Sequence, residues 1–315
     1  MISKECFTKN WIDQKSQEHH FNDKNIIEKV IRAFSLLDML AQSNCPFHFK
    51  GGSCLMLLLK DARHRLSIDI DIICPPGTDI EQYLKAYKDF GFIDYRPVER
   101  IQRSSSIPKS HSKFYYHVAF LDDSRRQESI LLDVLNEECH YEQVLELPID
   151  GPFLNIEGTP NKVKVPSVGD ILGDKLTAFA PYTSGIPMGK NKELEIIKQM
   201  YDVASLIQEM DDFDLVKKTY SNTLKTEIAY RGETLTEKDC LIDTIKTEQH
   251  KKEVAQLVEP VKIEAGINKI IAGKYEEGLK VLEPYVDGDY NNWWPLHYYL
   301  ACAYRELECI PEAIE

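Results

Sequence analysis

The sequence lacks several features that would place it in a specialised class of protein. It has no uninterrupted apolar run of about 18 residues, so no membrane-spanning helix is expected. Its eight cysteines include no C-x-x-C pair, which excludes the usual zinc and dithiol redox motifs. No apolar signal peptide opens the chain. We therefore expect a cytoplasmic protein whose cysteines are buried free thiols.

The chain also lacks an excess of basic residues. It carries 51 acidic and 38 basic side chains, a net charge of −13, which argues against non-specific coating of nucleic acid. Basic residues nevertheless gather within 96–126, at Arg96, Arg100, Arg103, Lys109, Lys113, Arg125 and Arg126. This stretch is either a phosphate-contacting surface or a solvated loop, and the sequence leaves both readings open.

Hydrophobic periodicity predicts a mixed α+β chain. We expect helices over 25–41, 79–90, 167–179 and 192–209, with Ser167 as the N-cap of the third. Strands are expected over 47–50, 68–72, 114–121 and 129–135, the last two joined in a hairpin. After Pro166 the character becomes helical. The sequence thus predicts a small mixed sheet followed by a helical domain.

The residues that carry chemistry surround a glycine turn. Gly51-Gly52-Ser53 follows a strand and opens a helix, where glycines let the backbone approach a phosphate and free N–H groups attract it. Asp69 and Asp71 lie two apart in the next strand, so both carboxylates share one face. Carboxylate oxygen is the ligand that Mg²⁺ prefers. This pattern predicts a metal and polyphosphate site.

A third carboxylate is expected from a neighbouring strand. Asp133 is the one acid inside the apolar strand 129–135, and a buried acid there normally binds something. We predict that Asp133 joins Asp69 and Asp71 as a metal ligand.

Four sequence blocks resemble the AbiEii/AbiGii-type nucleotidyltransferase toxins, relatives of DNA polymerase beta. They are Lys50–Ser53, Arg65–Asp71, Gly173–Ala180 and Lys198–Val203, and the resemblance spans about 26–210. The resemblance implies that Gly52 and Ser53 hold a triphosphate, that Asp69 and Asp71 bind Mg²⁺, and that Lys175 contacts phosphate. Asp202 matches the acid of the last motif; it either positions Lys175 or the acceptor hydroxyl, or is a helix-surface acid beside Lys198.

The match to the family is incomplete at three points. Lys50 and Arg65 belong to the matching blocks as nucleotide-binding residues, but Arg65 would equally serve to hold the acidic strand in place. Many relatives place an arginine before the last acid, whereas this chain offers Lys190, Lys192 and Lys198. Asp133 matches the family by context alone.

The resemblance implies an enzyme that moves a nucleoside monophosphate from a nucleoside triphosphate to an acceptor hydroxyl with two Mg²⁺ ions. It further implies a toxin of a toxin–antitoxin or phage-defence system, with a cognate antitoxin and an RNA acceptor such as tRNA. The alternatives are a nucleotide-binding protein without catalysis and a protein-interaction scaffold. The expected organisation is an N-terminal segment (1–25), a nucleotidyltransferase domain (26–165), a helical domain completing the active site (166–255) and a tail (256–315).

The tail resembles tetratricopeptide repeats. Residues 273–279 are echoed by 309–314, and the apolar residues between them recur at helical spacing. That period is close to the 34 residues of such repeats, but the tail covers fewer than two units. Generic helical packing remains the alternative.

Overall fold

The protein is described here from a computed structural model. The structure describes residues 1–60, 65–98, 109–121, 125–188, 192–231, 234–249, 263, 265–285, 299–304 and 307.

The first half of the described chain begins with helices and then contains all the strands. The elements are η1 (Lys4–Phe7), α1 (Lys9–Glu18), α2 (Lys24–Gln42), β1 (His48–Lys50), α3 (Gly51–Leu58), β2 (Ile70–Cys74), η2 (Ile80–Tyr83), β3 (Asp94–Pro97), β4 (Lys109–His117), β5 (Gln127–Asn136), β6 (Val144–Pro148) and β7 (Lys162–Pro166).

The second half is helical. It contains α4 (Val168–Leu176), η3 (Thr177–Phe179), α5 (Glu193–Glu209), α6 (Phe213–Arg231), α7 (Glu237–Gln249), α9 (Tyr275–Leu282) and η4 (Glu283–Tyr285). No helix in the described ranges is both long and apolar enough to cross a membrane.

The strands form one mixed sheet in the order β3-β4-β5-β2-β1-β7-β6. The central pairs β2–β5 and β1–β7 are parallel, while β1–β2, β4–β5, β3–β4 and β6–β7 are antiparallel. Since β2 lies between β1 and β5, residues of these three strands are brought side by side. The predicted small mixed sheet is confirmed, with three strands, β3, β6 and β7, that the sequence patterns did not indicate.

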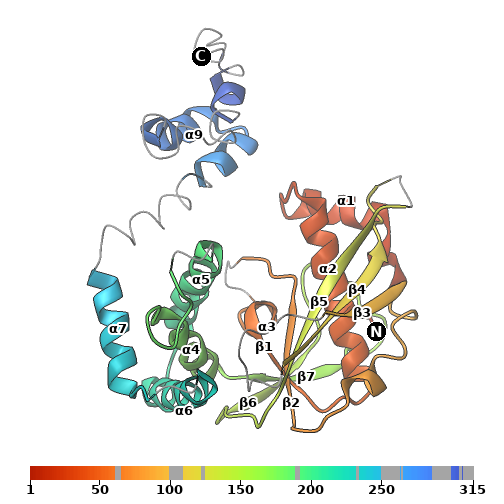
Figure 1. Ribbon diagram of the computed structural model, residues 1–315. Helices are drawn as coiled ribbons and strands as arrows, with labels where there is room; N and C mark the ends of the chain where they lie inside the picture. Colours follow the sequence, from red (N-terminus) through yellow and green to blue (C-terminus); the bar gives the residue numbers. More distant parts are fainter. Residues whose placement is uncertain are drawn as a thin grey trace.

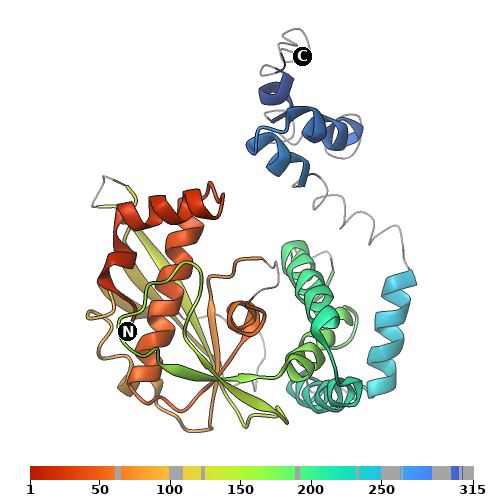
Figure 2. The ribbon, with the colours of Figure 1, turned by 180° about the vertical axis from the view of Figure 1, so that it is seen from behind.

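One face of the sheet packs on α2, and the two ribbon views agree on this arrangement (Figures 1 and 2). Ile70 and Ile72 point into that core, as the alternating pattern predicted. Asp38, a polar residue within the apolar face of α2, is 2% exposed and accepts hydrogen bonds from the Ile2 backbone and the Asn161 side chain. It therefore ties the N-terminal segment to the core.

Most predicted elements are confirmed, and one is wrong. The helix expected over 25–41 is α2, and the Ser167 hydroxyl caps α4 by accepting from the Asp170 N–H. The helix expected over 79–90 is only the single 3-10 turn η2, followed by turns to Phe90. Consecutive turns instead bury Leu84, Phe90 and Phe92, and the Phe92 ring packs edge-on against Phe114. Packing of these rings overrides the weak helical pattern.

The described tail is helical and has its own apolar cluster. Ile263, Ile267, Ile270, Leu279, Leu282, Leu300 and Ala303 are buried together, separately from the main core. The second repeat motif, 309–314, lies outside the described residues. The tetratricopeptide assignment therefore stays a prediction.

Candidate active site

The glycine turn lies directly against an acidic side chain. Gly51 has a positive φ of 78°, which L side chains rarely adopt, and a Cβ at this position would overlap the Asp71 carboxylate. The helix α3 begins at Gly51, so its first turn lies beside Asp71. The sequence needs glycine here for both conformation and space.

Three acids lie on or beside two adjacent strands. Asp71 on β2 is in register with Asp133 on β5, and since cross-strand neighbours share a face, both carboxylates lie on the side of the sheet opposite α2. Asp69 immediately precedes β2 and is exposed. The Ser53 hydroxyl is buried and donates to the Asp69 carbonyl at 2.5 Å, which fixes the segment entering β2.

The charge around Asp71 is unfavourable without a cation. Burial, then the neighbouring carboxylate of Asp133, and also that of Asp69, raise the pKa of Asp71 to about 6, although Lys50 opposes the rise. Asp133 is held by the buried His111, whose Nδ1 lies 2.5 Å from Oδ1 of Asp133. His111 is also the register partner of Asp133 on β4.

A second cluster joins the sheet to the helical domain through Lys50. The Nζ of Lys50 lies 2.9 Å from Oδ2 of Asp174 on α4, and the Tyr141 hydroxyl donates to the same oxygen at 2.9 Å. Burial opposes a charge on Lys50, but Asp174, Tyr141 and Asp71 outweigh it and raise the pKa of Lys50 well above its usual range. Burial likewise opposes the Asp174 carboxylate, yet Lys50 and Tyr141 lower its pKa. The lysine is thus a fixed cation beside Asp71.

A third cluster centres on the buried Asp202 of α5. Its two oxygens accept from Nε and Nη2 of Arg65 at 3.0 and 2.8 Å. Lys175 on α4 donates to Oδ2 of Asp202 at 2.9 Å and to Oε1 of Gln199 at 3.1 Å. Asp202 is 1% exposed, so it is an internal anchor for two cations rather than a helix-surface acid.

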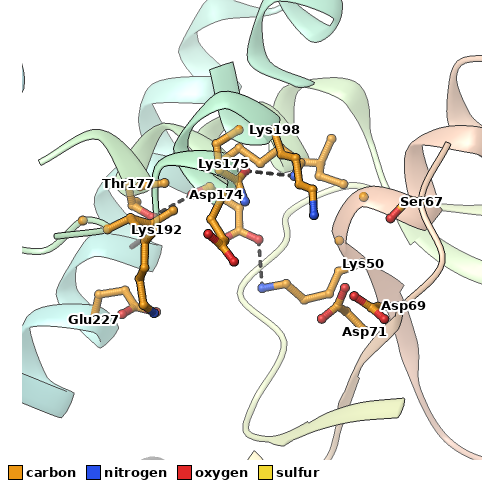
Figure 3. Close-up of a pocket in the computed structure, with 18 of the residues that line it drawn as sticks. Lys50, Ser67, Asp69, Asp71, Asp174, Lys175, Thr177, Lys192, Lys198 and Glu227 are labelled. Carbon is orange, nitrogen blue, oxygen red and sulfur yellow. Dashed lines mark hydrogen bonds and ion pairs between the residues drawn. The ribbon is translucent and has the colours of Figure 1, made fainter. Parts of the chain in front are cut away.

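These clusters surround a cavity of about 590 Å³ between the sheet and the helical domain. Figure 3 shows Lys50, Asp69 and Asp71 on one wall and Asp174, Lys175, Lys192 and Lys198 on the other. Lys50, Gly51, Gly52, Arg65 and Lys175 of the predicted site also line it. Ser53, Asp133 and Asp202 do not line the cavity, but each is hydrogen-bonded to a residue described above. Most of the predicted site residues thus meet around one space.

The acids suit a hard cation. Asp69 and Asp71 offer carboxylate oxygens on the cavity wall. A bound cation would offset the burial and the neighbouring carboxylates of Asp133 and Asp69, which raise the pKa of Asp71. Among the described residues, no group of three or more His, Cys, Asp or Glu is arranged as a ready metal site. The chemistry of the pair Asp69 and Asp71 fits Mg²⁺, and the role of Asp133 as a third ligand stays a prediction.

Sequence reasoning did not single out three residues of the site. Asp174 adjoins Lys175 in a matching block, so its position offered a signal that went unused. Tyr141 and His111 offered no such signal. The loop after β5 brings Tyr141 to Asp174, and the pairing of β4 with β5 brings His111 to Asp133.

Comparison with known proteins assigns the family. The family model described as nucleotidyl transferase AbiEii toxin, Type IV TA system, matches residues 35–280. A search of curated protein sequences finds no match.

Among solved structures, MenT4, a nucleotidyltransferase toxin from Mycobacterium tuberculosis H37Rv, is similar with a TM-score of 0.49 and 13% identity over 74% of this chain and 76% of that one. JHP933 from Helicobacter pylori is similar with a TM-score of 0.37 and 13% identity over 82% of this chain and 99% of that one.

Proposed function

The chain belongs to the AbiEii family of nucleotidyltransferase toxins of type IV toxin–antitoxin systems, and from that premise we propose how its own residues perform nucleotidyl transfer. The family implies a nucleoside triphosphate substrate and a cognate antitoxin. We propose that this chain is catalytically active and transfers a nucleoside monophosphate to the terminal hydroxyl of an RNA such as tRNA. The observation that carries the proposal is the Gly51 turn pressed against Asp71, facing a cavity that Lys175 also lines.

The triphosphate would bind across the two walls of the cavity. The backbone at Gly51 and Gly52 opens α3, whose N–H groups and dipole attract an anion. Lys50 and Arg65 lie beside this turn, with the Arg65 guanidinium against Gly52, while Lys175 supplies positive charge from the facing wall. Ser53 acts indirectly in this scheme, because its hydroxyl holds the Asp69 backbone.

Asp69 and Asp71 would hold Mg²⁺, with Asp133 as the third acid. When bound, two such ions would neutralise the phosphates and stabilise charge on the attacking and leaving oxygens. His111 keeps the Asp133 carboxylate turned to the side of the sheet on which Asp71 lies.

Lys175 would stabilise the charge that develops on the departing pyrophosphate. Asp202 positions Lys175. Its carboxylate accepts hydrogen bonds from both Lys175 and Arg65 and so fixes both cations before the substrate binds. This pre-organisation avoids reorientation of long side chains during the reaction.

The test uses purified protein, labelled triphosphates and total RNA. The variant Asp69→Ala with Asp71→Ala should lose transfer by about 10³-fold, because the loss of even one group that stabilises transition-state charge costs about 10²–10³-fold. Asp79→Ala with Asp89→Ala, two acids outside the cavity wall, is the matched control and should keep it. Transfer that persists in the first variant would refute the assignment; triphosphate binding without transfer to any acceptor would instead indicate an inactive binding protein.

A further inference from the structure

The face of the sheet that carries Asp71 continues, strand by strand, to the edge at β3. Asp71 is in register with Asp133, and Asp133 with His111. Two residues further along β4, Lys113 pairs with Leu131 on β5 and with Arg96 on β3. Because register partners share a face, these side chains lie on the same side as the catalytic acids.

This outer face, defined by Lys109, Lys113, Tyr115 and Arg96, is accessible and cationic. Lys109 and Lys113 are exposed, and the side chain of Arg96 is 69% exposed. Tyr115 is half-buried, with the Arg96 guanidinium 5.0 Å from its ring centroid. Asp94 lies on the same face at this edge and forms an ion pair with Arg96. The face thus combines positive charge with an aromatic ring in a protein whose net charge is −13.

The outer face is joined to the active-site cavity. Lys109, at the start of β4, lines the cavity together with Asp69 and Asp71. Adjacent strands are about 4.8 Å apart, so β3 lies about 14 Å from β2. A stacked strand rises about 3.4 Å per nucleotide, so the face has room for roughly four nucleotides.

We propose that the outer face of β3, β4 and β5 binds the single-stranded end of the acceptor RNA and leads its terminal hydroxyl to Asp69 and Asp71. This rests on the proposed transfer to RNA. Lys113 and Arg96 contact phosphates, Tyr115 stacks on a base, and Lys109 guides the last phosphate into the cavity. Single strands are bound by this combination of a positive track and aromatic rings, and exposed sheet surfaces are a common platform for it.

The first test measures binding directly. A fluorescently labelled single-stranded RNA hexanucleotide is titrated with the full chain, and anisotropy gives the Kd at several salt concentrations. Lys113→Glu should raise the Kd about tenfold and reduce the salt slope by about one, because one phosphate contact is lost. Tyr115→Ala should raise the Kd about tenfold, whereas Tyr115→Phe, which keeps the ring, should restore it.

The matched control is Lys162→Glu. Lys162 is an exposed lysine on β7, which lies beyond β2 and β1 from the outer face, so its replacement should leave RNA binding unchanged. Thermal unfolding of each variant separates lost binding from lost folding. A Kd that is equal for the wild type, Lys113→Glu and Tyr115→Ala would overturn the proposal.

The second test measures transfer, so that failure of the binding surface is distinguished from failure of the proposed function. Lys113→Glu should raise the RNA KM about tenfold and leave the triphosphate KM unchanged. If the wild-type protein binds RNA through Lys113 but modifies only a protein or a metabolite, the proposed transfer to RNA is wrong and the proposed RNA-binding surface stands. If Lys113→Glu transfers to RNA with an unaltered RNA KM, the proposed transferase activity stands and the proposed RNA-binding surface is wrong.

Discussion

At the scale of single residues, the contact between Tyr141 and Asp174 controls the position of Lys50. Tyr141→Phe removes only the hydroxyl that donates to Asp174. One such hydrogen bond contributes about 1 kcal/mol, so Lys50 should be held less firmly and the triphosphate KM should rise several-fold. Steady-state kinetics would measure this change.

The control is Tyr230→Phe, which removes a comparable bond to Glu137 at 2.6 Å, between two residues that do not line the cavity. Both variants should lose similar stability, but only Tyr141→Phe should alter the triphosphate KM. Equal kinetics in the two variants would show that the Tyr141 contact is merely structural.

Gly51 combines a conformational and a steric requirement. Gly51→Ala should lose about 1 kcal/mol through its positive φ and should also displace the Asp71 carboxylate, reducing transfer at least tenfold. Gly77 has nearly the same φ, 81°, with open space around it, so Gly77→Ala should show the stability loss alone. Chemical denaturation and transfer assays on both variants would check this, and full activity in Gly51→Ala would contradict it.

At the scale of elements, Asp170 joins three segments that position the site. It is fully buried and accepts from the backbone N–H groups of Glu142 and Gln143, from Ser167 and from Thr219 on α6. Its removal would leave several buried donors unsatisfied, each costing about 1–3 kcal/mol.

Asp170→Ala should therefore destabilise the protein by roughly 3 kcal/mol or more, measured by urea denaturation. Asp214→Ala, which removes a 92% exposed carboxylate near the start of α6, should change stability by less than about 0.5 kcal/mol. A small effect of Asp170→Ala would mean that these segments are held together by apolar packing instead.

At the scale of the whole molecule, the tail and the catalytic part have separate apolar cores. The tail cluster shares no residue with the main cluster in the described part of the chain. Deleting 256–315 should leave the triphosphate KM within about twofold of the full chain and the main unfolding transition nearly unchanged. Loss of triphosphate binding on deletion would show that the tail contributes to the site. If toxicity is lost while binding is kept, the tail recruits a partner.

How far the sequence predicted the site can be judged from particular residues. Local spacing was sufficient for Gly51, Asp69, Asp71 and the cap at Ser167, because each depends on neighbours within a few positions. It failed for the segment after Asp79, where burial of Phe90 and Phe92 decides the conformation. It also gave no indication of Tyr141, and it did not single out Asp174 although this residue adjoins Lys175; both matter through contacts made across the fold.

The sequence by itself determined that a glycine turn would open a helix and that Asp71 would lie on the strand face opposite Ile70 and Ile72, since the φ of glycine and two-residue alternation are local properties. Only the tertiary structure decided which cations meet these acids. Lys50 faces Asp174, and Arg65 and Lys175 share Asp202, because the sheet order and the packing of α4 and α5 bring distant segments together. Pairing across such separations follows from the burial of whole elements, which local patterns do not encode.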